Sequence, residues 1–133
     1  DTMAALEKTG VKIPNIRNTI ENMSGGQRQC VAIARTASFH SKLTIMDEPT
    51  AALGVQETAQ VENIVRTLKA AGEPLILVSH NMRQVFDLVD RVIVFRRGRI
   101  CANIDIKANK ITGEDIVAYI TGAKTQEGYE DAA

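Results

Sequence analysis

The sequence predicts an α/β fold in which a mostly parallel sheet is flanked by helices and ends in a β-hairpin. Two short apolar runs, KLTIMDEP (42–49) and PLILVSH (74–80), are typical of buried strands in a parallel sheet. Residues 55 to 71 lie between them and show helical periodicity, and the order strand, helix, strand builds parallel sheets. The chain has 133 residues, 44% of them hydrophobic, which is enough for one domain with its own core.

The first part of the chain leads from irregular sequence into an amphipathic helix. Residues 1 to 9 are typical of a helix that Gly10 ends, and residues 11 to 23 contain Pro14 and several asparagines, which favour turns. From Gly26 to about Ser38 the sequence predicts a helix with small apolar residues on one face. The residues at helical spacing on that face are Cys30, Val31, Ala34 and Ala37, with Arg28 and Arg35 on other faces.

The second part of the chain continues the alternation and then changes character. The helix over 55 to 71 has an apolar face formed by Val61, Ile64, Val65 and Leu68, and Gly72 is expected to end it. A short helix is predicted over 81 to 89. The run RVIVFRRGRICANI (91–104) is typical of two strands joined by a tight turn at Arg97-Gly98, so the sheet is expected to become antiparallel there.

The last helix is predicted from its start. Thr112 and Asp115 have the spacing of a capping box, and the helix is expected to continue through Ile116, Val117, Tyr119 and Ile120. Tyr119 and Ile120 are interpreted as packing residues. From Thr125 onward the tail is expected to be disordered.

Composition excludes several classes of protein. Sixteen Lys and Arg balance sixteen Asp and Glu, so the long-range field that attracts nucleic acid is missing, and Arg96, Arg97 and Arg99 are interpreted as a solvated turn. Cys30 and Cys101 lack the spacing of a zinc site or a disulfide framework, so we expect two small core residues in a reducing compartment. No apolar run reaches the roughly 20 residues of a membrane helix, and no secretory leader is expected within these residues.

Asp47 and Glu48 follow the first predicted strand directly. Ligands of open α/β sheets bind at the carboxyl ends of the strands, so two carboxylates there can serve Mg²⁺ and an attacking water. The plain alternative is that they only begin a polar loop before Pro49, and this segment alone does not decide between the two.

The segment MSGGQ (23–27) stands at the start of the first predicted helix. Ser24 is a good N-cap, and Gly25 and Gly26 would let backbone N–H groups approach an anion at the helix N-terminus. The alternative is a flexible turn capped by Ser24. His80 ends the second strand after Ser79 and could bind a phosphate oxygen or a water at the same sheet edge, although a lone histidine is more often structural.

Three segments, taken together, resemble the ATP-binding cassette (ABC) ATPases: MSGGQRQCVAIAR, LTIMDEPTAALG and ILVSH, in that order. The first is similar to the signature motif, the second to the Walker B strand with its catalytic carboxylate and D-loop, and the third to the His-switch. The resemblance covers about residues 15 to 105. The DEPTAALG variant and the stretch SHNMRQVFDLVDRV resemble the carbohydrate-importer branch most closely.

The resemblance implies a role for each matching position. Asp47 would serve Mg²⁺ through water, Glu48 would be the general base, and His80 would contact the γ-phosphate. The residues implied to contact ATP held by a partner subunit are Ser24, Gly25, Gly26 and Gln27. The D-loop residues implied to line the dimer interface are Ala51, Ala52, Leu53 and Gly54. The implied partners are a second ABC ATPase subunit in a head-to-tail dimer and transmembrane permease subunits, with no nucleic acid, at the cytoplasmic face of the cell membrane.

The sequence departs from the family pattern in two ways. The residues that differ from the common motifs are Met23, Thr44, Ala51 and Gly54, and none of them removes a group implied in catalysis. The phosphate-binding loop GxxxxGK[ST] occurs nowhere in the 133 residues. In the nearest string, TGAKT, Ala123 stands where the second glycine must be, and upstream of the string Ala118 stands where the first must be.

We therefore expect the C-terminal half of a longer ATPase, an expectation that the start at Asp1 without methionine supports. Residues 1–124 would be a partial nucleotide-binding domain, with 1–23 a remnant of a helical subdomain and 24–124 the signature and Walker B core, followed by the tail 125–133. The resemblance also implies that a strand from elsewhere lies between the strand ending at His80 and the one starting near Arg91. Two alternatives stay open: a non-catalytic interaction module, or an ABC ATPase in DNA repair or translation.

Overall fold

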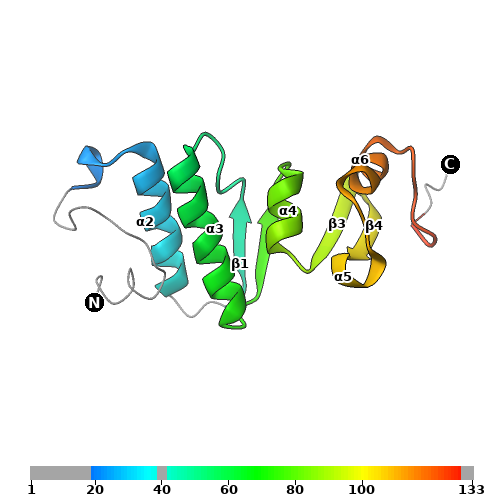
Figure 1. Ribbon diagram of the computed structural model, residues 1–133, viewed down its shortest axis with the longest axis horizontal. Coiled ribbons are helices and arrows are strands. Elements are labelled where there is room, and N and C mark those ends of the chain that lie inside the picture. The colour runs from blue at the N-terminus through cyan, green and yellow to red at the C-terminus, as the bar shows by residue number, and fades with distance from the viewer. Residues whose placement is uncertain (1–18, 39–41, 130–133) are drawn as a thin grey trace. The chain divides into compact units, whose positions relative to one another are not determined.

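The computed structural model describes residues 19–38 and 42–129, so the predicted helix over residues 1 to 9 lies outside the described residues. The chain divides into two compact units, Asp1–His80 and Asn81–Ala133. Figure 1 shows the elements of both units, coloured from the N-terminus to the C-terminus.

The described part of the first unit contains two helices and two strands after a short 3₁₀ turn, η1 (Ile20–Asn22). Its elements are α2 (Gly25–Ser38), β1 (Thr44–Asp47), α3 (Val55–Ala70) and β2 (Leu75–Val78). The two strands pair in parallel, with Thr44 opposite Leu75 and Asp47 opposite Val78. All four elements match the predicted segments, and Gly72 ends α3 with a left-handed φ of 76° as expected.

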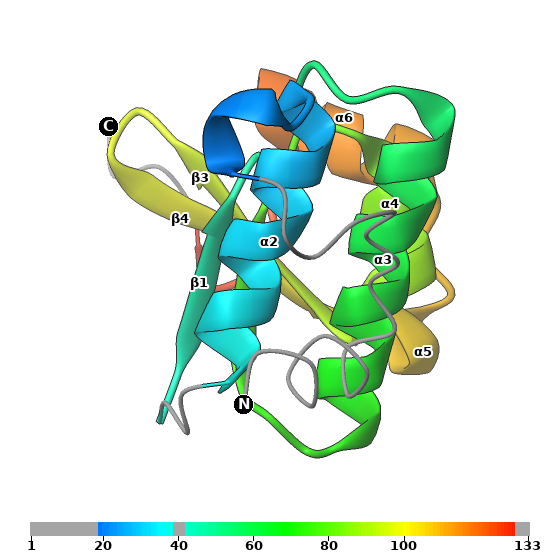
Figure 2. The same cartoon turned by 90° about the vertical axis from the view of Figure 1, so that its left-hand side faces the viewer.

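Helices α2 and α3 lie side by side (Figure 2), and their contact forms the core of this unit. Small and β-branched side chains make close packing possible, because they keep little bulk between the helix axes. The buried residues in this core are Cys30, Ile33 and Ala34 from α2, and Val61, Ile64, Val65 and Leu68 from α3. The predicted apolar faces of the two helices are therefore confirmed, except that Val31 is only partly buried and the side chain of Ala37 is not described.

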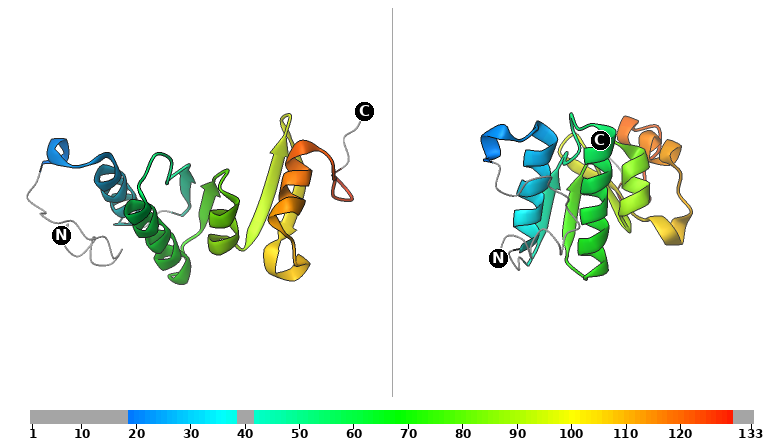
Figure 3. Two further views of the ribbon diagram at one scale, coloured as in Figure 1. Left: turned by 45° about the horizontal axis from the view of Figure 1, so that its top comes forward. Right: turned by 60° about the vertical axis from the view of Figure 1, so that its left-hand side comes forward.

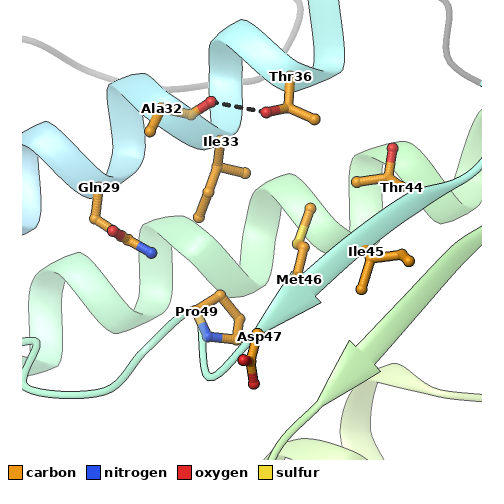
Figure 4. Close-up of a pocket in the computed structure, with 9 residues that line it drawn as sticks. All are labelled: Gln29, Ala32, Ile33, Thr36, Thr44, Ile45, Met46, Asp47 and Pro49. Atoms are coloured by element: carbon orange, nitrogen blue, oxygen red, sulfur yellow. Dashed lines mark hydrogen bonds between the residues drawn. The ribbon is translucent and has the colours of Figure 1, made fainter.

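Strand β1 is buried on one face only, and β2 alternates between half-buried and exposed residues. In β1, Thr44 and Met46 are buried, whereas Ile45 between them is 64% exposed. In β2, Ile76 and Val78 are each about half exposed. Helix α2 covers the side of β1 to which Met46 points (Figure 4), and successive side chains of a strand point to opposite faces. The prediction that both faces of these apolar strands are covered is thus wrong for the described residues.

The second unit packs a helix against a hairpin (Figure 3). Its elements are α4 (Met82–Leu88), β3 (Arg91–Arg96), β4 (Arg99–Asp105), α5 (Ile106–Asn109) and α6 (Gly113–Thr121). The buried cluster joins strands and last helix, and its members are Val94, Ala102, Ile104, Ile116 and Tyr119. Val117 and Ile120 are 47% and 45% exposed, so the expectation that Ile120 packs in the core is wrong.

The hairpin turn has the predicted position and a clear physical basis. Arg97 and Gly98 have φ values of 50° and 77°, and two successive left-handed residues give the type of turn that fits the twist of a hairpin. The predicted capping box is confirmed: the Thr112 hydroxyl accepts from the Asp115 N–H, and the Asp115 carboxylate accepts from the Thr112 N–H at 2.9 Å.

The strands form two separate two-stranded sheets, one parallel and one antiparallel. The two pairs belong to different units, so the expectation that the sheet turns antiparallel at the hairpin, with a strand from elsewhere between residues 80 and 91, stays a prediction. Near the chain end, the Gln126 side chain accepts from the Asn103 N–H at 2.7 Å. Disorder of the tail beyond Thr125 stays a prediction.

Candidate functional site

The carboxyl ends of β1 and β2 bring the candidate catalytic residues to one edge of the parallel sheet. The register places Asp47 beside Val78, so Glu48 and His80 follow at the same edge. The Glu48 N–H donates to the Val78 carbonyl at 2.9 Å, which extends the ladder one residue beyond β1. The arrangement at the sheet edge that the sequence predicted for these residues is present.

Glu48 and His80 are in direct contact. Glu48 Oε1 accepts a hydrogen bond from the His80 backbone N–H at 3.1 Å and lies 2.7 Å from His80 Nδ1. The Glu48 side chain is 33% exposed and that of His80 86% exposed, so solvent reaches this pair. Glu48 has a φ of 43°, a left-handed conformation that costs energy in a residue with a Cβ atom. The fold thus holds one carboxylate in a strained conformation toward a histidine.

Asp47 is next to Glu48 in the chain, and its side chain points to the opposite face of β1 from the side chain of Met46 (Figure 4). It is exposed at the end of β1, on the side away from α2 (Figure 4). The described residues include no group of three or more His, Cys, Asp or Glu that could hold a metal ion. One exposed carboxylate nevertheless fits the way in which Mg²⁺ is usually bound, through one or two carboxylates together with substrate phosphates.

Residues 24–27 form an ordered helix start. The Gln27 N–H donates to Ser24 Oγ at 3.2 Å, and the Ser24 N–H donates to Gln27 Oε1 at 3.0 Å, so the two residues form a reciprocal capping box. The Ser24 hydroxyl accepts this bond, and its own hydrogen can therefore be donated to a further acceptor. Ser24 is the N-cap that the sequence predicted, and Gln27 has a structural partner that the sequence analysis did not assign to it.

Residues 51–54 connect β1 to α3 through a tight turn. The Ala51 N–H donates to the Glu48 carbonyl at 3.0 Å, and Ala52 has a φ of 60°. Gly54 is the N-cap of α3 and its carbonyl accepts from the Thr58 N–H at 2.9 Å. The turn therefore starts at Glu48 and ends at α3, which places the candidate general base and this segment on one continuous piece of backbone.

One residue near these segments was missed by sequence reasoning. Glu57 lies in the first turn of α3, and its side chain contacts Gly26 and Gly54. Burial raises the pKa of the Cys30 thiol, and the negative charge of Glu57 raises it further, so the carboxylate also lies close to α2. A lone glutamate in a helix carries no signal of such contacts, because they depend on two other parts of the chain.

A shallow hollow of about 160 Å³ lies between α2 and β1 (Figure 4). It is lined by Gln29, Ile33, Met46 and Pro49 among others, with Asp47 at one end. Its walls are mostly packing residues, and the contact between Glu48 and His80 is not part of it.

Comparison with solved structures defines the class of protein to which the fold belongs. A metal-chelate type ABC transporter in an inward-facing conformation has a TM-score of 0.72 at 22% identity, over 91% of this chain and 47% of that one. The ADP conformation of an ATP-binding cassette of an ABC transporter has a TM-score of 0.69 at 26% identity, over 93% of this chain and 46% of that one. The fold is that of the C-terminal part of an ABC ATPase, an α/β nucleotide-binding fold.

Sequence relatives then give the family. The ABC transporter family model matches residues 1–51. The chain is 47% identical to the fructose import ATP-binding protein FrcA of Rhizobium meliloti over 123 residues, 91% of this chain and 46% of that protein. It is 44% identical to the xylose/arabinose import ATP-binding protein XylG of Sulfolobus acidocaldarius over 95 residues, 71% of this chain and 38% of that protein. The chain is thus similar to ATP-binding proteins of the ABC transporter family, and it spans less than half the length of these relatives.

None of the described helices is long and apolar enough to cross a membrane.

Proposed function

We propose that this chain supplies the signature segment, the Walker B carboxylates, the D-loop and the His-switch of an ATP-hydrolysing subunit that drives sugar import. The observation that carries the proposal is the contact between Glu48 and His80 at the carboxyl edge of the parallel sheet, with Asp47 next to it. One of the two relatives is named for fructose import and the other for xylose/arabinose import, which supports a sugar as the transported solute.

The residues divide the chemistry among them. Glu48 orients a water and accepts its proton, which is the task of a general base in phosphoryl transfer to water. His80 holds the Glu48 carboxylate through two contacts and presents the rest of its ring to solvent, where it would contact the terminal phosphate. Asp47 would hold Mg²⁺ through water, and the ion would neutralise charge on the phosphates.

The second half of the nucleotide site would come from a partner. Residues 24–27 would contact ATP held by a second ABC ATPase subunit, residues 51–54 would lie at the head-to-tail interface, and permease subunits would carry the solute. The ordered capping box supports this, because it fixes the helix start without using the Ser24 hydroxyl hydrogen. In this proposal residues 1–124 are part of a nucleotide-binding domain, located at the cytoplasmic face of the membrane.

An exchange protein tests the proposal. The aligned residues of the Rhizobium meliloti fructose import ATP-binding protein are replaced by those of this chain, and ATP hydrolysis and ATP binding are measured. We expect hydrolysis, and we expect Glu48→Gln to lower kcat at least about 100-fold with ATP binding retained, because a general base contributes roughly 10²–10⁴ in rate. The matched control is Glu73→Gln, a carboxylate at the opposite end of β2, which should leave kcat within about twofold of the unsubstituted protein. Normal hydrolysis by the Glu48→Gln protein would remove Glu48 from its proposed role.

One sequence observation favours a second function, that of a non-catalytic interaction module. The 133 residues contain no GxxxxGK[ST] loop to hold a nucleotide. We expect the chain alone not to hydrolyse ATP, and turnover by the chain alone that Glu48→Gln abolishes would contradict this.

A further inference from the structure

The two adjacent glycines of the signature segment face different surroundings. A Cβ atom built on Gly25 would meet nothing within 4 Å. A Cβ atom built on Gly26 would lie 3.0 Å from Glu57 Cβ and 3.1 Å from Glu57 Cδ, and closer still to Glu57 Cγ. Gly25 therefore has open space at its Cα, whereas Gly26 is a glycine because the stem of Glu57 occupies the space of a side chain.

The same glutamate also occupies the space beside Gly54. A Cβ atom built on Gly54 would lie 2.7 Å from Glu57 Oε2. Gly54 has a φ of −70°, which any residue adopts, and the atom that lies in this space is the end of the flexible Glu57 side chain. One side chain thus fills the gaps left by two glycines that are 28 positions apart.

Neighbouring contacts keep Glu57 in this place. One turn further along both helices, Cys30 Sγ donates to Gln60 Oε1 at 3.5 Å, and Cys30 and Val61 are buried. Glu57 occupies the third position of α3, where the helix dipole favours a negative charge and from which a carboxylate can reach back to the N-cap. The helix dipole therefore favours the carboxylate at the start of α3, and the aliphatic stem lies against Gly26 of α2.

We propose that Glu57 is a positioning residue that sets the distance between residues 24–27 and residues 51–54. The inference rests on the proposed function, in which the first segment contacts a partner's nucleotide and the second lines the dimer interface. A plainer role is that Glu57 only stabilises the start of α3. The positioning role and the capping role differ in one respect. If Glu57 sets the distance between the segments, a change at position 26 affects residues 51–54; if Glu57 only stabilises the helix start, it does not.

The first experiment uses the 133-residue chain without nucleotide. Alanine in place of glycine near a helix start normally stabilises, so Gly25→Ala should not lower the protection of the Ile64 amide against hydrogen exchange. Gly26→Ala should lower that protection about tenfold, because the new methyl group overlaps atoms near the backbone of Glu57. Adding Glu57→Ala to Gly26→Ala should recover most of this loss, since the two residues compete for one space.

The readout that separates positioning from capping is the amide NMR spectrum of residues 51–54. Gly26→Ala should shift these resonances, and Glu57→Ala in the same chain should abolish that effect of residue 26. Glu57→Gln keeps the stem and the size and should leave the resonances of residues 24–27 in place. If Gly26→Ala is as harmless as Gly25→Ala, or leaves residues 51–54 unmoved, the inference is wrong.

The second experiment is kinetic and uses the exchange protein described above. Glu57→Ala should lower kcat about tenfold with little change in the KM for ATP, because a misplaced segment affects the transition state more than nucleotide binding. Glu57→Gln should restore kcat, and a kcat per folded molecule unchanged by Glu57→Ala would overturn the proposal. If the unsubstituted exchange protein does not hydrolyse ATP, the proposed function fails, while the NMR experiment still decides whether Glu57 couples the two segments.

Discussion

Because the backbone of Glu48 is strained, we expect glycine at position 48 to give a more stable protein than alanine, which is the reverse of the usual order of stability. A left-handed conformation costs a residue with a Cβ atom about 1–2 kcal/mol, and Glu48 has a φ of 43°. Glycine avoids this cost but loses about 0.5–1 kcal/mol through its greater freedom in the unfolded chain. Both Glu48→Gly and Glu48→Ala remove the carboxylate that His80 contacts, so this loss cancels in the comparison. We expect Glu48→Gly to be the more stable of the two by about 1 kcal/mol.

Hydrogen exchange at the amides of Ile64 and Val65 measures this difference, because both residues are buried in the core of the first unit. About 1 kcal/mol corresponds to a roughly fivefold slower exchange in the Glu48→Gly chain. Asp47 provides the matched control, since it lies in β1 with an extended backbone, where alanine should be more stable than glycine. If Glu48→Ala proves as stable as Glu48→Gly, then the turn does not impose the left-handed conformation.

Two further predictions concern the second unit. The hydrogen bond from the Thr112 N–H, followed by that from Lys124, lowers the pKa of Asp115 from 3.8 to about 2. Because the pKa is lower in the folded state than in the unfolded state, the ionised carboxylate stabilises the fold above about pH 4. This contribution to stability is lost as the pH falls toward 2. An NMR titration checks this, and a midpoint near 3.8 would contradict it. Ile116→Ala should lower the free energy of unfolding by about 2–5 kcal/mol, because Ile116 is buried. Val117→Ala should lower it by about 0.5 kcal/mol or less, because Val117 is half exposed. Chemical denaturation measures both values, and similar losses for the two variants would refute the assignment of Ile116 to the core.

The elements that the sequence predicted well are those whose signal is local. The apolar spacing in α3, the glycine after it and the capping box at Thr112 each depend on residues within two or three helical turns. The one-turn helix α5 was not predicted, because four residues are too few for a period and only the cap at Asp105 marks its start.

The burial of β1 and β2 shows where local patterns end. The runs around Ile45 and Ile76 are almost continuously apolar, which favours a strand covered on both faces, yet half of each strand is exposed among the described residues. The sequence of a strand records how apolar it is, and the elements that cover it lie elsewhere in the chain or in a partner.

The candidate site was predictable in part for the same reason. Glu48 and His80 could be placed at one sheet edge, because parallel strands end at the same side, and the structure then brings them to 2.7 Å. The contact of Glu57 with Gly26 and Gly54 could not be predicted, since it depends on how closely two helices approach each other.

The contact between Glu48 and His80 also fixes which nitrogen of the ring carries a proton. An ionised carboxylate only accepts hydrogen bonds, so a neutral His80 bonded to Glu48 has its hydrogen on Nδ1 and a lone pair on Nε2. The exposed Nε2 can then accept a hydrogen bond from water. A neutral His80 that keeps its contact with Glu48 therefore offers solvent a hydrogen-bond acceptor, and not a donor, at this nitrogen.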